Sequence, residues 1–258
     1  MVDVGAFDDV EGAKDPERFV AWMDHQRSRM KDSVHAPLHL RRGDRVLDLG
    51  CGTGTDLAAA STAAGWAVGV DLSTTMITAA ARRSEGRFAL VTGDGQRLPF
   101  GAGSFDACSF RAVLVHTPAP EQTMAEIRRV LAPGGRVVLS EPDHGSHVVA
   151  TSEGDVFERV KIHRQGRFRH PLIGRSLAAL ATGAGLTVTG CWALPILHRS
   201  FDDATDSGGP FGLAVDAAVA DGAISDDEAS RYIASLRSLD EAGSFFFAGL
   251  SVVVTAAV

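Results

Sequence analysis

RVLDLGCGTGTDL, residues 45–57, joins an apolar run to three glycines within five positions. The apolar run is typical of a buried strand, and the residues after the glycines are typical of a helix. In an α/β sheet, ligands bind at the turn that follows the first strand. Gly50, Gly52 and Gly54 fall on that turn, where glycine permits a positive φ and a close approach to the backbone. An ordinary tight turn is the alternative, but it seldom needs three glycines, so we expect a ligand-binding turn.

The surrounding sequence predicts a doubly wound parallel sheet covered by helices. Between residues 43 and 139, short apolar or β-branched runs alternate with longer Ala-rich segments. The first helices are expected over residues 53–64 and 74–83. The runs that we interpret as successive strands are RVLDLG (45–50), AVGVDL (67–72), FALVTGD (88–94), FDACSFR (105–111) and RVVLSEP (136–142).

Beyond residue 141 the alternation weakens. We expect helices over residues 153–165, 171–186, 213–220 and 225–241, a polar loop over 198–210, and strands over 186–194 and 244–258 that lie side by side. Ser225 and Glu228 have the spacing of a capping box. Tyr232 is expected to pack, and Phe245, Phe246 and Phe247 are expected in the core.

The composition limits the classes of function. The chain has 258 residues, 45% of them hydrophobic and 22% charged, which is typical of a globular protein. Its net charge of −7, without a basic stripe, argues against a nucleic-acid partner. The sequence has no export signal and no apolar run of about 20 residues, so we expect no membrane partner. The 3 cysteines have no metal-ligand spacing, so we expect a cytoplasmic protein without a metal site.

The spacing of the glycine turn argues against a dinucleotide. The third glycine of that fingerprint would stand at position 55, which is Thr55. Asp48 lies inside the first predicted strand, where a buried carboxylate needs a polar or cationic partner. A cationic ligand near the turn would satisfy that need better than a pyrophosphate.

Two further acids end neighbouring predicted strands. Asp71 ends the second strand, where a carboxylate can accept hydrogen bonds from both hydroxyls of a ribose; its alternative role is a helix N-cap, which Ser73 or Thr74 fills more naturally. Asp94 could accept from an exocyclic amine, with Gly95 and Gln96 around the purine, or could simply form an Asp-Gly turn. A positive charge, a ribose and an adenine together describe S-adenosylmethionine.

The same residues resemble a known family. VLDLGCGTG, the GVDLS acid with Met76 five residues later, GDGQRLPF, SFDACSFRAVLVH and EIRRVLAPGGRVVLSEP resemble, in order and spacing, the class I S-adenosylmethionine-dependent methyltransferases. The resemblance covers residues 40–142 and is strongest to bacterial small-molecule enzymes of the ubiquinone and menaquinone methyltransferase group. It implies a Rossmann-like seven-stranded sheet whose last strand is antiparallel.

The resemblance also implies roles for individual residues. Residues 50–54 line the methionine part, Asp71 holds the ribose, and Leu114, Val115 and His116 open the acceptor side. The full set of expected cofactor-binding residues is Asp48, Gly50, Cys51, Gly52, Thr53, Gly54, Asp71, Leu72, Met76, Asp94, Gly95, Gln96, Arg111 and Ala112.

On the acceptor side, methyl transfer needs positioning, and a base only for some acceptors. His116 follows the fourth predicted strand and is the best candidate base; its alternative role is to orient the loop before Pro118. Asp143 and His144, in a loop after the fifth strand, could orient or deprotonate an acceptor. Arg169 and His170 belong to a basic stretch that could face an acidic substrate group or be a solvated helix end. Trp22 and His25 could belong to a lid over the cofactor or to the core.

We therefore expect one domain over residues 1–258: a helical lid (1–42), a cofactor-binding core (43–142), and acceptor-side helices with the final strands (143–258). The expected function is methyl transfer from S-adenosylmethionine to a small organic acceptor, with secondary metabolism as one setting. A sulfonium-assisted cyclisation or rearrangement and a non-enzymatic binding module remain open, as does a homodimer.

Overall fold

The computed structural model describes residues 20, 21, 23, 35–206 and 209–258. These residues form a seven-stranded sheet of order β3-β2-β1-β4-β5-β7-β6. The strands are β1 (Val46–Leu49), β2 (Ala67–Asp71), β3 (Ala89–Thr92), β4 (Phe105–Arg111), β5 (Leu131–Val149), β6 (Thr187–His198) and β7 (Phe247–Ala257). β7 is antiparallel to both neighbours, and the pairs from β3 to β5 are parallel. The predicted fold class is confirmed.

The helices are α2 (Thr55–Ala64), α3 (Thr74–Ser84), α4 (Pro120–Val130), α5 (Gly154–Gln165), α6 (Leu177–Gly183), α7 (Phe201–Asp206), α8 (Leu213–Ala220) and α9 (Asp226–Glu241), with short 3-10 turns η2 (Ala36–Leu38) and η3 (Ile173–Ser176). Ser73 caps α3 by accepting a hydrogen bond from the Met76 backbone nitrogen at 3.1 Å. The predicted capping box of Ser225 and Glu228 opens α9. Polar residues thus start these two helices where the sequence predicted them.

Alternate residues of β1 pack into different cores because successive side chains of a strand point to opposite faces. Leu47 belongs to a core with Met124 and Ile127 of α4 and with Leu177 of α6. Val46 belongs to a second core that includes residues of α2 and η2. Both faces are covered by helices, which explains why the strands of the parallel part are near-continuous apolar runs.

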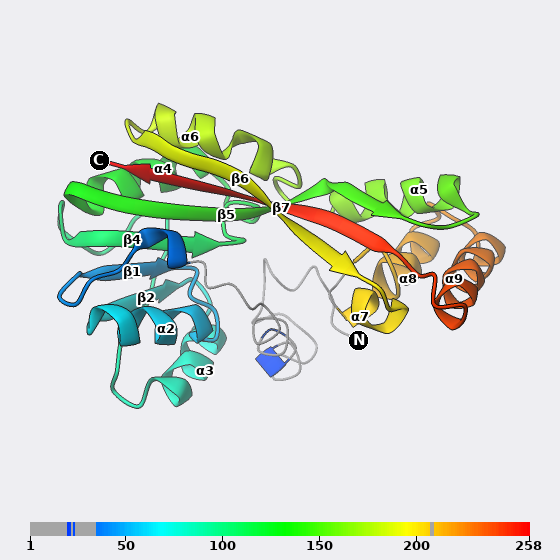
Figure 1. The fold of residues 1–258 in the computed structure, drawn as a ribbon, viewed down its shortest axis with the longest axis horizontal. Coiled ribbons are helices and arrows are strands. Elements are labelled where there is room, and N and C mark those ends of the chain that lie inside the picture. Colours follow the sequence, from blue (N-terminus) through cyan, green and yellow to red (C-terminus); the bar gives the residue numbers. More distant parts are fainter. Residues whose placement is uncertain (1–19, 22, 24–34, 207–208) are drawn as a thin grey trace.

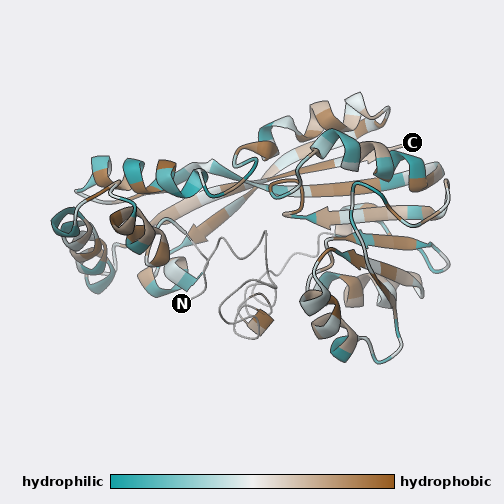
Figure 2. Ribbon diagram, turned by 180° about the vertical axis from the view of Figure 1, so that it is seen from behind, coloured by the Kyte–Doolittle hydropathy of each residue, from teal (hydrophilic) through white to brown (hydrophobic). Residues whose placement is uncertain are grey.

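Strands β5, β6 and β7 are much longer than the others and run out of the covered sheet towards a second group of helices (Figure 1). We call α5, α7, α8 and α9 the helical lobe. Its core contains Phe157, Phe211, Tyr232, Phe245 and Phe247, so Tyr232 packs as predicted. In Figure 2 the long strands are largely apolar, whereas the helices alternate between apolar and polar residues.

Three expectations for this half of the chain are wrong. The stretch after residue 142, expected as a loop, continues β5 as far as Val149 because β7 and β6 extend alongside it. The expected polar loop over 198–210 contains α7, whose Phe201 and Ala204 are buried in the lobe. Phe246 is 39% exposed, whereas Phe245 and Phe247 are buried. The described helices include none that is both long and apolar enough to cross a membrane.

Candidate functional site

The glycine turn between β1 and α2 is left-handed at all three glycines. The φ angles of Gly50, Gly52 and Gly54 are +64°, +53° and +80°. A Cβ on Gly50 would overlap Val113, and one on Gly54 would lie 3.1 Å from the Cβ of Ala80. Among the described residues, a Cβ on Gly52 would meet only the Met23 methyl, at 3.9 Å. Gly50 and Gly54 therefore allow close packing, and Gly52 leaves room above the backbone.

Asp71 is in direct contact with this turn. Its Oδ2 accepts a hydrogen bond from the Gly52 backbone nitrogen at 2.8 Å, and its Oδ1 accepts one from the Ser73 nitrogen at 2.9 Å. Ser73, rather than Asp71, caps α3. The next residue, Leu72, is 71% exposed. A carboxylate and an exposed apolar side chain therefore stand together beside Gly52.

Asp48 has partners inside the protein. Its Oδ1 accepts a hydrogen bond from the Ser109 hydroxyl at 2.8 Å and lies 4.0 Å from Nε2 of His35. The Ser109 oxygen is 2.7 Å from the same His35 nitrogen. This set of hydrogen-bonded side chains was not predicted, although Ser109 is a polar residue in an apolar strand and pairs in register with Asp48. The burial of Asp48 is thus balanced without a ligand, and its role in cofactor binding stays a prediction.

Asp94 is exposed and forms a turn. Its Oδ1 accepts a hydrogen bond from the Gln96 backbone nitrogen at 2.9 Å, and its carbonyl accepts one from the Arg97 nitrogen at 3.0 Å. A Cβ on Gly95 would lie 3.1 Å from Leu49, so the turn lies directly on the end of β1. The turn-forming role is present in the structure, and contact of this turn with a purine stays a prediction.

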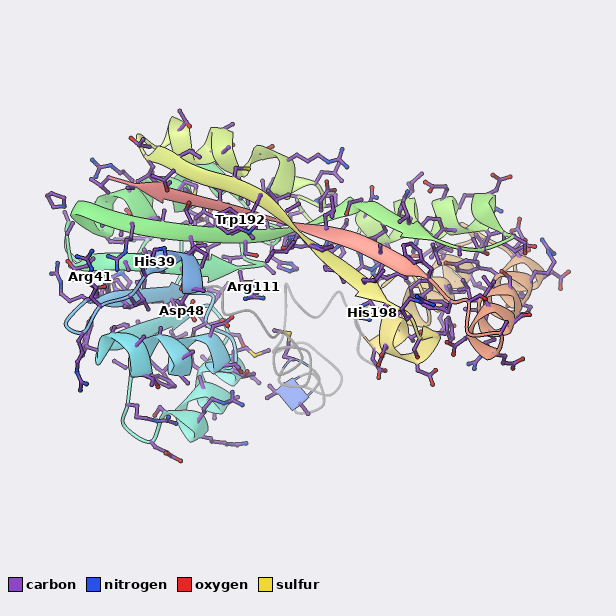
Figure 3. The ribbon with its side chains drawn as sticks, in the orientation of Figure 1. His39, Arg41, Asp48, Arg111, Trp192 and His198 are labelled. Carbon is purple, nitrogen blue, oxygen red and sulfur yellow. The ribbon has the colours of Figure 1, made fainter. Side chains whose placement is uncertain are left out.

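The remaining expected cofactor residues divide into buried and accessible ones. The side chains of Cys51, Thr53 and Met76 are buried, so a ligand at the turn can meet chiefly their backbone. Nε of Arg111 lies 3.5 Å from Oδ2 of Asp56. Ala112 has a φ of 54°, and its nitrogen donates to the Ser140 carbonyl at 2.8 Å. Figure 3 shows Arg111 at the end of β4 nearer the helical lobe, with His39 and Arg41 at the opposite end of the sheet.

Glu141, which was not among the predicted catalytic or binding residues, holds the loop after β4. It is fully buried in β5, and its carboxylate accepts hydrogen bonds from the backbone nitrogens of Val113 at 2.7 Å, Leu114 at 2.8 Å and Val115 at 3.2 Å. We call residues 112–117 the post-β4 turn. His116 lies on this turn, half-buried, with its ring 5.7 Å from the Phe168 ring. A buried carboxylate therefore positions the candidate base.

Asp143 is engaged in a two-point ion pair. Its Oδ2 and Oδ1 accept hydrogen bonds from Nε and Nη2 of Arg175 at 2.7 and 3.1 Å, and Oδ1 also accepts one from the Gly145 nitrogen at 2.8 Å. Such a pair orients the carboxylate strongly. The geometry favours a positioning role for Asp143, and its contact with an acceptor stays a prediction.

His144 is held as a neutral hydrogen-bond acceptor. Its Nδ1 lies 3.0 Å from Nη1 of Arg164, which can only donate, and its ring stacks on Phe168 at 4.1 Å. Burial, followed by the charge of Arg164, lowers the pKa of His144 well below the ordinary histidine value. These contacts disfavour proton uptake by His144, so His116 is the better candidate base.

The basic stretch predicted near the acceptor is divided by the fold. Arg169 is exposed, and the backbone nitrogen of His170 donates to the Val115 carbonyl at 3.1 Å, which ties the stretch to the post-β4 turn. Arg164, in contrast, is buried beneath them. Trp22 and His25 lie outside the described residues. In the part of the chain that the structure describes, no group of three or more His, Cys, Asp or Glu side chains could hold a metal ion.

Comparisons with known proteins point to one family. Residues 47–139 match the family model described as a methyltransferase domain. The chain is 40% identical over 168 residues to an uncharacterized 37.1 kDa protein in transposon TN4556 of Streptomyces fradiae. It is 38% identical over 137 residues to the demethylmenaquinone methyltransferase of Beutenbergia cavernae. These matches cover 63% and 53% of this chain and 48% and 56% of the relatives, so the chain spans about half the length of the curated relatives that it matches.

Solved structures share the fold. A protein of Bacillus halodurans C-125 has a TM-score of 0.63 at 20% identity, with 87% of this chain and 96% of that chain covered. The [4+2]-cyclase SpnF has a TM-score of 0.53 at 21% identity, with 92% of this chain and 80% of that chain covered. At this identity the likeness concerns the fold alone.

Proposed function

We propose that this chain transfers a methyl group from S-adenosylmethionine to a small organic acceptor, because its residues 47–139 match a methyltransferase domain and it is similar to a demethylmenaquinone methyltransferase. The cofactor would lie across the carboxyl ends of β1, β2 and β4. The acceptor would lie between the post-β4 turn and the carboxyl end of β5. An acceptor of secondary metabolism is part of this proposal.

The observation that carries the proposal is the hydrogen bond from Gly52 to Asp71. It brings the carboxylate that ends β2 to the one glycine of the turn whose missing Cβ leaves room for a ligand. Carboxylates accept hydrogen bonds from paired ribose hydroxyls, and free backbone N–H groups at a helix start favour polar ligand groups. The exposed Leu72 offers an apolar surface against which an adenine can pack. The residues present therefore fit an adenosyl ligand.

When bound, S-adenosylmethionine supplies an electrophilic methyl group on a sulfonium. Held by residues 50–54 and Asp71, it would give up this methyl group to an electron pair of the acceptor as the carbon–sulfur bond breaks, with S-adenosylhomocysteine as the leaving group. The chain's task is to hold the acceptor in line and to exclude water. The buried Glu141 fixes the backbone of the post-β4 turn, and that turn presents His116. For a hydroxyl acceptor, the His116 imidazole takes the proton.

A second function uses the same bound cofactor without consuming it. The fold is shared with the [4+2]-cyclase SpnF, which favours keeping a sulfonium-assisted cyclisation or rearrangement as the alternative.

One incubation separates the two functions. The full chain is mixed with methyl-labelled S-adenosylmethionine and a panel of phenol, enol and carboxylate acceptors. Methyl transfer predicts one S-adenosylhomocysteine for each labelled product. A product formed without S-adenosylhomocysteine supports the rearrangement, and the absence of any product with every acceptor contradicts the proposed transfer to these classes.

We also propose a cytoplasmic location, because Cys51, Cys108 and Cys191 are all free thiols and free thiols are typical of reducing compartments. A homodimer remains part of the proposal and is tested by light scattering of the purified chain.

A further inference from the structure

Arg164, at the end of α5, is a buried cation without a matching anion. Its side chain is 6% exposed. Nη1 lies 3.0 Å from Nδ1 of His144, and the guanidinium carbon lies 4.9 Å from the centre of the Phe168 ring. Nε is covered and has no hydrogen-bond acceptor. Among the described residues, no ion pair within 4.0 Å includes Arg164.

The neighbours of Arg164 do not supply a negative charge. Burial lowers the pKa of Arg164 to about 10, so it stays protonated at neutral pH. Burial first, and Arg164 second, lower the pKa of His147 to about 3, so His147 is neutral. Asp143 is paired with Arg175, and Glu141 is bonded to backbone nitrogens. A buried charge without an opposite charge beside it is costly, so the burial of Arg164 indicates an anionic ligand.

His147 is the second buried group without a partner. It is 8% exposed, and its Nδ1 is covered without a hydrogen bond. Its ring lies 5.7 Å from that of His144, and the charge of Arg164 acts on both. Two unsatisfied polar groups therefore share one small region of the protein.

A bulge in β5 brings these groups together. Between the paired positions Asp143–Leu250 and Val148–Ala248, residues 144–147 of β5 stand opposite Gly249 alone. A Cβ on Gly249 would lie 2.7 Å from Cδ2 of His147, so glycine makes room for this imidazole. Bulges of this kind redirect side chains and are enriched near active sites.

The cluster adjoins the acceptor side of the candidate site. The Phe168 ring stacks on His144 at 4.1 Å and lies 5.7 Å from the ring of His116. The His170 nitrogen bonds the Val115 carbonyl on the post-β4 turn. Phe168 thus lies near both the cluster and His116, which puts a ligand group at Arg164 close to the acceptor side.

We propose that Arg164, assisted by His147, binds a carboxylate of the methyl acceptor, which makes the acceptor a small organic acid. His144 occupies Nη1, which leaves the edge of Nε and Nη2, a two-donor fork that matches two carboxylate oxygens. Neutral His147 adds a further N–H in its Nδ1-protonated tautomer. Entry of the carboxylate displaces the side chains that cover this edge. The inference rests on the proposed function, because it concerns the acceptor of that reaction.

The first test uses a small anion, so that its result does not depend on the shape of the acceptor. Crystals of the full chain grown with S-adenosylhomocysteine are soaked in sodium bromide, and anomalous scattering locates the bromide. The proposal predicts a peak within hydrogen-bond distance of Arg164. Bromide found only at exposed arginines, as an adventitious ion only, would overturn the proposal. An ordered water that joins Arg164 to His147 in place of bromide would also overturn it.

The second test uses formate, the smallest carboxylate, in solution. Binding to the full chain broadens the formate proton resonance. Arg164→Met should reduce this broadening at least about threefold. Arg237→Met is the matched control, because Arg237 also stacks on a phenylalanine, at 5.1 Å from the Phe201 ring, but lies in the helical lobe. Equal broadening in all three proteins contradicts the proposal.

Thermal unfolding checks that Arg164→Met is folded and separates a binding role from a structural one. Removal of an uncompensated buried cation should leave the Tm unchanged or raise it by about 2 to 4 °C. A Tm that is lower than that of the wild type would assign Arg164 to the stability of the fold and contradict the proposal. The variant should bind S-adenosylhomocysteine as tightly as the wild type does. If the wild-type chain itself fails to bind this compound, the proposed function is refuted, and this outcome is distinct from failure of the carboxylate site.

Discussion

Oδ2 of Asp71 lies 2.8 Å from the backbone nitrogen of Gly52, which joins the end of β2 to the glycine turn after β1. Asp71 ends β2 and Gly52 lies in the turn after β1, and the carboxyl ends of these neighbouring parallel strands meet at the same edge of the sheet. This edge is where open α/β sheets bind ligands, so the contact marks the centre of the proposed cofactor site.

Asp71→Ala should weaken the binding of S-adenosylhomocysteine by about 1 to 3 kcal/mol, the range for losing hydrogen bonds to a charged group. Isothermal calorimetry measures the change. Asp227→Asn, an exposed acid on α9, is the control and should bind as the wild type does. Unchanged affinity in Asp71→Ala would remove Asp71 from the ribose site.

Gly52→Ala should combine backbone strain with a blocked ligand face. A non-glycine residue at a φ of +53° costs about 1 to 2 kcal/mol of stability, and the new Cβ would point into the space left for the ligand. Gly65→Ala is a matched control because Gly65 has a φ of +87° and no described residue comes within 4 Å of the added Cβ. Both variants should lose similar stability in urea unfolding, but only Gly52→Ala should lose cofactor affinity. Equal affinity in the two variants would be evidence against a ligand over Gly52.

Glu141→Gln tests the support of the post-β4 turn. The amide replaces one carboxylate oxygen with a donor that faces backbone N–H groups, so the variant should lose about 1 to 3 kcal/mol of stability. It should also lower the turnover of the methyl-transfer reaction more than it changes cofactor affinity, because the turn carries His116 and not the ribose contact. Wild-type turnover in a destabilised variant would limit Glu141 to a folding role.

The stability of the chain should fall in mild acid. The unfolded chain protonates His147 near the ordinary pKa of about 6.5, whereas the folded chain holds that pKa at about 3. The unfolded state therefore binds more protons below pH 6.5. For His147, each pH unit of acidification lowers the free energy of unfolding by up to about 1.4 kcal/mol. The stability that depends on neutral His147 is fully present above the pKa of the unfolded chain, about 6.5. It is lost as the pH falls towards the pKa of the folded chain, about 3.

Urea unfolding at pH 7.5 and pH 5 measures this dependence. His147→Gln removes one of the groups and should reduce the loss of stability between the two pH values. An identical loss in the variant would mean that the pKa of His147 is the same in the folded and unfolded chains.

The sequence was most informative where a local rule determines the outcome. Alternating apolar runs predicted β1 to β5, and the glycines after β1 predicted a turn that the structure shows to be left-handed. Ser73 and Ser225 were predicted as helix starts because capping depends only on neighbouring residues. Asp71 was expected at the turn because parallel strands end at one edge of the sheet.

Contacts between distant segments were not predictable from the pattern. The stretch with His144 and His147 was expected as a loop because its polar residues do not alternate with apolar ones. It is a strand because β7 pairs with it on both sides of the bulge at Gly249. Arg164 resembled the other basic residues of its segment, and only the packing of α5 against β5 buries it. His35 contacts Asp48 and Ser109 only because the fold brings these distant parts of the sequence together.

A crystal structure of the full chain with S-adenosylhomocysteine tests the central claim most directly. We expect both ribose hydroxyls within about 3 Å of the Asp71 carboxylate, with the nucleoside over Gly52 and the adenine against Leu72. Density for the compound elsewhere on the protein, or none at saturating concentration, would contradict it.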